Sequence, residues 1–324
     1  MIGSGFMAKK HCSVLKNHPF AELYTIADKE INESNKSFKD EFGFKKITTN
    51  LDEAVENCDI IFIVTPNLLH PGQTIKALEH NKHVFCEKPL AYTKAEFEEI
   101  GKALSNTGCK LQVGMNCRFR TIYSETKKLT DKGEIGDIKL ISGSYVFDLV
   151  DTIKSNEKEW WLQYPAGTFT YLHAGAVHAL DLMRWFGGEI KSVSAEGSGF
   201  ELKEEWEKDT FVVNIEYNSG KPGKFICSAS AFKPPDFSFE IWGSKGSILG
   251  KDIYLKINRN LEKRGIEVKQ DKLDILLQFE DLINSIESNR EPLNSFSEAL
   301  KNFELINAIE QSVKTSQKIY LNNK

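Results

Sequence analysis

The sequence lacks a long hydrophobic run: no segment approaches the roughly 18 consecutive apolar residues that a membrane-spanning helix requires. Its first residues also lack the basic stretch and apolar core of a secretory signal peptide. It has no excess of positive charge: it contains 42 Lys and Arg residues and 46 Asp and Glu residues, which gives a net charge of −4. Nucleic-acid-binding proteins usually carry a basic stripe. We therefore expect a cytoplasmic protein that binds neither membranes nor nucleic acids.

Paired cysteines are also missing. The six cysteines are spread singly along the chain, at Cys12, Cys58, Cys86, Cys109, Cys117 and Cys227. None forms the C-x-x-C pair or the Cys/His spacing of a structural zinc site. Single cysteines in apolar segments are typical of reduced, buried side chains. The sequence predicts no bound metal.

Short apolar runs alternate with amphipathic segments over the first 118 residues. We expect strands at 22–27, 59–64, 83–86 and 110–113, and helices at 6–15, 51–57, 71–79 and 94–105. Strands that alternate with helices indicate a parallel sheet covered on both faces. The sequence predicts an α/β, Rossmann-type, doubly wound domain over residues 1–118.

The pattern changes after residue 118. Expected strands at 139–147, 191–196, 210–217, 224–230 and 237–243 follow one another mostly without helices between them. Helices are expected near 123–132, at 176–186, where Gly187-Gly188 ends the run, and at 273–288 and 297–316. This arrangement predicts an α+β domain over residues 119–324, with a mostly antiparallel open sheet.

A glycine-rich turn opens the first expected helix. Gly3-Ser4-Gly5-Phe6-Met7-Ala8 fits the pattern G-x-G-x-x-A. Glycines at these places allow a tight turn and bring backbone amides at a helix N-terminus close to a pyrophosphate. We expect Gly3, Gly5, Phe6 and Met7 to contact the cofactor.

Asp28 ends the next expected strand, about 20 residues beyond the glycines, where dinucleotide-binding domains carry the acid that binds the adenosine ribose. A carboxylate accepts hydrogen bonds from the ribose hydroxyls and repels a 2′-phosphate. NAD is therefore favoured over NADP, although the neighbouring Lys29 is compatible with a phosphate. The alternative is a glycine turn and a strand-end Asp that bind no ligand.

The strand that should precede Gly3 is represented only by Met1 and Ile2. This strand would occupy the middle of the sheet, so its absence would compromise the domain at its centre. We expect that the first strand is truncated because several N-terminal residues are missing, through a misplaced start.

Two polar segments follow expected strands where each strand ends. They are TPNLLH at 65–70 and EKP at 87–89. Ligands bind at the carboxyl ends of the strands in open parallel sheets. The residues expected to contact the cofactor there are Thr65, Pro66, Asn67, His70, Glu87 and Lys88.

Together these features resemble the glucose–fructose oxidoreductase/inositol dehydrogenase (Gfo/Idh/MocA) family. The resemblance rests on the glycine turn, TPNLLH, HVFCEKPLA at 83–91, VGMNCRF at 113–119, GEIGDI at 133–138, HALDLMRWFGG at 178–188, EIWGSKGSI at 240–248 and IYL at 319–321. It spans essentially the whole chain. It implies an NAD-dependent oxidoreductase that transfers a hydride between nicotinamide and a hydroxyl-bearing carbon of a sugar, polyol or nucleotide-sugar. It also implies that residues 1–118 form a dinucleotide-binding domain, that residues 119–324 form a domain for substrate binding and oligomerisation, and that the protein is a homodimer or homotetramer.

The resemblance implies two catalytic residues. Lys88 matches the family's active-site lysine, between the nicotinamide and the substrate hydroxyl, with a cis bond to Pro89. His178 matches the catalytic histidine of the second domain. A histidine that titrates near neutrality suits removal of the hydroxyl proton, and a cationic lysine stabilises developing alkoxide charge. The alternatives are a strand-end surface lysine and a core histidine on a helix face.

The expected substrate contacts are Arg118, Trp161, Tyr171, His173 and Asp181. Asp181 lies three residues after His178 on the same helix face, so it either orients the histidine or packs in the core. Many family members carry an Asp four residues before the histidine, but residue 174 is Ala here. His173 takes that place if the segment carries an extra residue. The usual glycine pair upstream is also reduced, to one glycine within residues 166–168.

Two other functions fit the same sequence. One is a non-catalytic NAD-binding sensor, which the missing Asp at position 174 favours and which the intact Lys88 and His178 oppose. The other is a reductase for a different class of small molecule, such as an imine or a tetrapyrrole.

Overall fold

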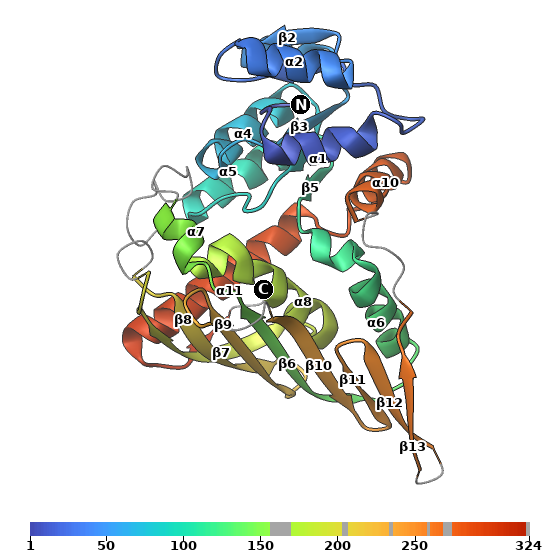
Figure 1. Cartoon of the computed structure of the whole chain (residues 1–324), viewed down its shortest axis with the longest axis vertical. Coiled ribbons are helices and arrows are strands. Elements are labelled where there is room, and N and C mark those ends of the chain that lie inside the picture. Colours follow the sequence, from blue (N-terminus) through green and yellow to red (C-terminus); the bar gives the residue numbers. More distant parts are fainter. Residues whose placement is uncertain (156–169, 203–206, 233–235, 258–259, 268–273, 322–324) are drawn as a thin grey trace. The chain divides into compact units, whose positions relative to one another are not determined.

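A computed structural model of the chain, shown in Figure 1, describes residues 1–155, 170–202, 207–232, 236–257, 260–267 and 274–321. The chain forms two compact units. The first contains Met1–Asn116 and Lys272–Leu300, and the second contains Cys117–Asp271 and Lys301–Lys324. The chain therefore passes from one unit to the other three times. The predicted division after residue 118 stays a prediction for the functional domains, and it did not anticipate the return of 272–300 to the first unit.

The first unit is built on a parallel sheet. Its strands are β1 (Thr25–Ala27), β2 (Lys46–Thr48), β3 (Ile60–Ile63), β4 (His83–Cys86) and β5 (Leu111–Val113). β1 pairs with β2, β3 with β4, and β4 with β5, all in parallel. Apart from β2, which begins with an exposed lysine, these strands are largely buried and mostly apolar, as expected for a sheet covered on both faces.

The first residues of the chain occupy the centre of this sheet. Ile2 forms parallel bridges to Ala27 and to Ile63, and so joins the β1–β2 pair to the other three strands. The Ile2 N–H donates to the Phe62 carbonyl at 2.7 Å, and the Ile2 carbonyl accepts from Val64 at 3.0 Å. Met1 and Ile2 thus occupy the central strand position, although they are the only residues of the chain that precede the glycine turn.

The helices of this unit are α1 (Phe6–Leu15), α2 (Glu33–Phe42), α3 (Leu51–Glu56), α4 (His70–Glu79), α5 (Lys94–Ser105) and α10 (Asp274–Glu287). Local signals set their ends: Thr93 and Glu96 form a capping box at the start of α5. The Phe279 ring of α10 packs edge-on against His18, 4.8 Å between ring centroids. Through this packing α10, which comes late in the chain, belongs to the first unit.

The second unit is built on a nine-stranded sheet. In spatial order its strands are β13 (Asn260–Gly265), β12 (Asp252–Ile257), β11 (Gly246–Leu249), β10 (Asp236–Gly243), β6 (Ile138–Val146), β9 (Pro222–Ser228), β8 (Thr210–Tyr217), β7 (Ile190–Ser198) and β14 (Ile319–Tyr320). Every neighbouring pair is antiparallel except β6 and β9. The predicted fold class, a Rossmann-type domain with a second domain built on a mostly antiparallel sheet, is confirmed.

The helices of the second unit are α6 (Thr121–Asp131), α7 (Val150–Ser155), α8 (Val177–Gly187) and most of α11 (Phe296–Thr315). α8 packs against β6 of the sheet (Figure 1). Side chains of β8 alternate between buried and more exposed positions, with Phe211, Val213, Ile215 and Tyr217 inside. This alternation is the period-2 pattern from which the strand was predicted.

No helix in the described part of the chain combines the length and the apolar character needed to cross a membrane. All six cysteines are free thiols, and all but the half-buried Cys58 are buried.

Candidate active site

The glycine-rich turn has the geometry that its sequence predicted. Gly3 has φ +99°, and a Cβ on it would lie 2.9 Å from the Val64 carbonyl oxygen, so this position admits only glycine. Gly5 is the N-cap of α1, and no side chain caps the helix there. Phe6 is 74% exposed and Met7 is half-buried. The first amides of α1 are thus suited to an anionic ligand such as a pyrophosphate.

The Asp28 carboxylate is held beside this turn. One of its oxygens accepts hydrogen bonds from the Ser4 backbone N–H at 3.0 Å and from the Ser4 hydroxyl. The other accepts from the Lys29 N–H at 2.7 Å. Each carboxylate oxygen has two lone pairs, so the half-buried group can still accept from ribose hydroxyls. The turn and the acid fit the two ends of an adenosine diphosphate moiety.

The segments after β3 and β4 are tied to each other. The Asn67 amide donates to the Tyr92 hydroxyl at 2.7 Å. The ring nitrogens of His70 lie 2.9 Å from the Thr65 carbonyl oxygen and 2.8 Å from that of Pro89. His70 is fully buried, and both of its ring nitrogens are next to backbone carbonyls. Its direct contact with a cofactor stays a prediction.

Lys88 is half-buried directly after β4, and its bond to Pro89 is cis. Glu87 beside it accepts a hydrogen bond from His11 of α1, 2.9 Å from Nε2 to Oε1. The sequence analysis missed His11. Its signal was an ionisable residue on the inner face of α1, where Ala8, Cys12 and Leu15 are also buried.

His178 is half-buried in the first turn of α8. The segment before it, Leu172–Ala176, is a π-helix, a conformation that is often found at functional sites. His173 lies in this segment and Tyr171 directly precedes it, and both are buried. Burial raises the pKa of the Tyr171 hydroxyl. Tyr171, His173 and His178 are therefore parts of one continuous helical segment.

His173 belongs to a small buried polar cluster. Its Nδ1 lies 3.2 Å from the Thr170 hydroxyl, which donates to Glu310 of α11 at 2.8 Å. Nδ1 lies 3.7 Å from the Glu310 carboxylate. Burial lowers the pKa of His173 to about 4 and raises that of Glu310 to about 7. Burial thus disfavours both the protonated, charged form of His173 and the ionised form of Glu310.

Arg118 and Asp181 are paired with each other. Nε and Nη2 of Arg118 donate to the two Asp181 oxygens at 2.8 and 2.7 Å, and the Asn302 amide donates to the same carboxylate at 2.8 Å. Their side chains are 3% and 1% exposed. Both were predicted to contact substrate. The structure gives each of them a partner inside the second unit, and that substrate role stays a prediction.

The structure thus gathers the predicted cofactor residues in the first unit, and the described predicted substrate residues in the second. Trp161 and the 166–168 segment lie outside the described residues. Over the described parts of the chain, no group of three or more His, Cys, Asp or Glu side chains is arranged to hold a metal ion.

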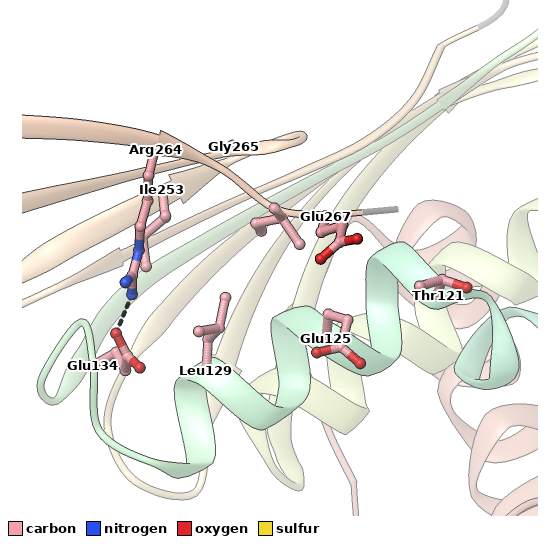
Figure 2. Close-up of a pocket in the computed structure, with 9 residues that line it drawn as sticks. Thr121, Glu125, Leu129, Glu134, Ile253, Arg264, Gly265 and Glu267 are labelled. Carbon is pink, nitrogen blue, oxygen red and sulfur yellow. Dashed lines mark hydrogen bonds and ion pairs between the residues drawn. The ribbon is translucent and has the colours of Figure 1, made fainter. Parts of the chain in front are cut away.

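A separate cavity of about 400 Å³ lies in the second unit, between α6 and the strands β12 and β13. Figure 2 shows Arg264 and Glu134 paired at one side of it, with Glu125 and Glu267 away from that pair. None of its lining residues is a predicted site residue.

The glycine turn, the uncapped α1 and the Asp28 carboxylate define a dinucleotide-binding protein of the Rossmann type. Residues 1–115 match the family model "Oxidoreductase family, NAD-binding Rossmann fold", and residues 127–321 match "Oxidoreductase family, C-terminal alpha/beta domain". The chain belongs to the Gfo/Idh/MocA oxidoreductase family, and its cofactor is NAD.

Curated relatives and solved structures agree with this assignment. The chain is 26% identical to scyllo-inositol 2-dehydrogenase (NAD(+)) of Bacillus subtilis (strain 168), over 93% of this chain and 85% of that protein. It is also 26% identical to the myo-inositol 2-dehydrogenase of Thermotoga maritima, over 78% and 75%. A levoglucosan dehydrogenase crystallised with NADH has the same fold, with a TM-score of 0.88 at 23% identity, over 100% of this chain and 98% of that one.

Replacing Asp181 with Ala should destabilise the second unit by about 3–5 kcal/mol, because it leaves the Arg118 guanidinium buried without its counter-charge. The double variant Arg118→Met/Asp181→Leu should lose less, since it removes both charges. Urea unfolding followed by circular dichroism measures both. Glu125→Ala, at an ion pair on the surface, is the control. A cost for Asp181→Ala no larger than for this control would contradict the structural role.

Glu310→Gln should stabilise the protein at pH 8 and have little effect at pH 4.5. The raised pKa means that the protonated carboxyl fits the fold, so stability present at low pH is lost as the pH rises through about 7. The difference in unfolding free energy between the variant and the wild type should grow by on the order of 3 kcal/mol across this range.

Urea unfolding at several pH values measures this difference. Glu304→Gln, at an exposed position of the same helix, is the matched control and should show no such growth. If the unfolding free energies of Glu310→Gln and the wild type change in parallel from pH 4.5 to 8, the pKa of the Glu310 carboxyl is not raised.

Proposed function

We propose that this protein is an NAD-dependent dehydrogenase that oxidises a hydroxyl-bearing carbon of a sugar, polyol or nucleotide-sugar, with Lys88 and His178 as its catalytic residues. One observation carries the proposal. The segment with Lys88 follows β4 at the carboxyl edge of the sheet, and Glu87 in it is bonded to α1, the helix that begins at the glycine turn. A cationic side chain is thereby placed at the edge of the sheet where ligands bind.

NAD supplies the hydride acceptor when it is bound. The Lys88 ammonium would then lie against the substrate hydroxyl and stabilise the negative charge that develops on its oxygen. His178 would accept the hydroxyl proton as the hydride leaves the carbon. Both side chains are half-buried, so each is accessible to a substrate and also held by its surroundings.

The substrate class follows from the family and from named relatives, which act on inositols and on levoglucosan. All of these are compact polyhydroxylated rings. We propose that this chain takes a substrate of the same kind. Buried hydrogen-bonding groups in such a site would reject an analogue that lacks the hydroxyls, such as an imine or a tetrapyrrole.

His173 stands in for the family's Asp in this proposal. A π-helical turn takes in one more residue than an α-helical turn, so the residue five positions before His178 is brought toward the place of the residue four before it. His173 would then support His178 as a neutral group, because its lowered pKa keeps it uncharged at neutral pH.

We also propose that the protein works in the cytoplasm as a homodimer or homotetramer. Six free cysteines, five of them buried, are typical of a reducing compartment. The second unit carries exposed apolar side chains on its sheet, including Val212 of β8 and Leu261 of β13, which an association between subunits would cover.

Asp28→Ala should weaken NADH binding by about ten- to a hundredfold, because charged hydrogen bonds to the ribose are lost. It should also reduce the preference for NADH over NADPH, since the repulsion of a 2′-phosphate disappears. Calorimetric titration of both nucleotides measures the two effects. Asp40→Ala, an exposed carboxylate on α2, serves as the control. Equal NADH affinity in Asp28→Ala and the wild type would show that the ribose is bound elsewhere.

Lys88→Ala and His178→Ala should each lower kcat by about a hundredfold or more, since each removes a group that acts on the substrate oxygen or its proton. NADH formation from NAD with levoglucosan, myo-inositol and scyllo-inositol provides the assay. Lys82→Ala and His80→Ala, at the surface of the first unit, are the matched controls. Full turnover in either catalytic variant would refute the assigned roles. Tight NAD binding without turnover of any polyol or sugar would favour the sensor.

A further inference from the structure

Lys88 lies between two residues that are each in contact with a buried histidine. His11 of α1 contacts Glu87, the residue before the lysine, and His70 of α4 contacts Pro89, the residue after it. The two histidines come from different helices and are 1% and 0% exposed. The backbone is therefore held from outside its own strand on both sides of Lys88.

The carboxylate of Glu87 makes the contacts on the upstream side. Its Oε1 lies 2.9 Å from His11 Nε2, and its Oε2 accepts the backbone N–H of Lys88 at 3.3 Å. Burial alone would raise the pKa of Glu87, but the hydrogen bond with His11 and the electrostatic effects of His11 and Lys88 hold that pKa below its usual range. An ionised carboxylate thus binds His11 and the backbone of Lys88 together.

Close packing surrounds this carboxylate and its histidine partner. The His11 ring meets Phe85 edge-on, 4.9 Å between ring centroids, and lies 5.7 Å from the Phe62 ring. On the other side, a Cβ at Gly114 would lie 2.8 Å from Glu87 Oε2. The absence of a side chain at Gly114 therefore leaves room for the carboxylate.

His70 makes the contacts on the downstream side. Its Nδ1 lies 2.8 Å from the Pro89 carbonyl oxygen and its Nε2 lies 2.9 Å from that of Thr65. Both neighbours only accept hydrogen bonds, and a neutral imidazole has one N–H, which it donates to one of the two. Burial lowers the pKa of His70, while the two carbonyls oppose that change. The ring links the segment after β3 to the segment after β4.

We propose that His11 and His70 are positioning residues for Lys88. They fix the backbone on both sides of the lysine, so that its ammonium reaches the substrate oxygen from one defined starting point. A lysine side chain is long and flexible, so its aim depends on where its backbone is held, and a displacement of about 1 Å can cost about a hundredfold in rate. The inference rests on the proposed function, in which Lys88 is catalytic.

The first experiment observes Lys88 directly by NMR. Lysines are reductively methylated with a ¹³C label, which preserves their charge, and the Lys88 signal is assigned by its loss in Lys88→Arg. With NADH present, we expect one sharp Lys88 signal in the wild type, displaced from those of exposed lysines. His11→Leu and His70→Leu should broaden it or move it toward the exposed-lysine position. His11→Gln and His70→Gln keep an N–H donor and should restore part of the displacement.

Two further sets of variants complete this experiment. Leu78→Ala removes a fully buried side chain about two turns along α4 from His70, so it lowers stability without touching Lys88, and the signal should stay in place. If the Leu variants fail to fold, His11→Asn and His70→Asn replace them, because Asn is too short to keep the contacts. An unchanged Lys88 signal in the Leu variants, or in the Asn variants that replace them, overturns the proposal.

The second experiment is a kinetic cycle. Each His→Leu change should lower kcat by about ten- to a hundredfold and change KM for NAD less than kcat. In a Lys88→Ala background the same changes should cause no further loss, because there is no lysine left to position. A full additional loss in that background would show a merely structural role. Turnover that survives Lys88→Ala would refute the proposed function instead, and the NMR result would still decide the positioning.

Discussion

The contact between the largely buried carboxylate of Glu87 and His11 is the interaction on which the proposed site in the first unit depends. An ionised carboxylate in a protein interior needs partners, because burial penalises its charge. His11 provides one partner and thereby ties α1 to the end of β4. Glu87 thus connects the helix that begins at the glycine turn with the strand that leads to Lys88, and its carboxylate occupies the space that a side chain at Gly114 would fill.

The second unit follows the same principle with another carboxylate. Asp181 lies on α8, the helix that carries His178, and it binds Arg118 and Asn302. The chain enters this unit at Cys117 and again at Lys301, so Arg118 and Asn302 are each the second residue of an entering segment. The helix with the proposed proton acceptor is thus anchored to both entering segments through one buried charge.

Some elements could be predicted and others could not, for identifiable reasons. The glycine turn and the EKP segment were found because each is a short local pattern that stands at the end of a strand. α2 and β2 were missed, because α2 is largely polar, with Phe38 and Phe42 as its buried apolar side chains, and β2 has three residues. The strands β11 to β13 were missed because they are short or carry exposed, charged side chains.

Side-chain partners were the hardest part to predict. Arg118 and Asp181 are 63 residues apart and were interpreted as two separate substrate contacts, although they pair with each other. His11 and Glu87 are 76 residues apart, and no pattern in the sequence connects them. The sequence marked each of these residues except His11 as chemically important. It did not indicate which of these side chains would form hydrogen bonds or ion pairs with one another.

The sequence by itself determined the alternation of strands and helices and the glycine turn, which are encoded over a few residues, where backbone sterics and hydrophobic periodicity act. It also marked Asp28, by its distance from the turn, and Lys88 and His178, by the family resemblance, as candidate site residues. Tertiary structure alone decided that His11 and His70 flank Lys88, that Asp181 neutralises Arg118, and that Glu310 shares a buried cluster with His173. Such pairings arise because a buried charge or hydrogen-bonding group must find a partner nearby in space. Strand order and helix packing, rather than spacing along the chain, determine which partner that is.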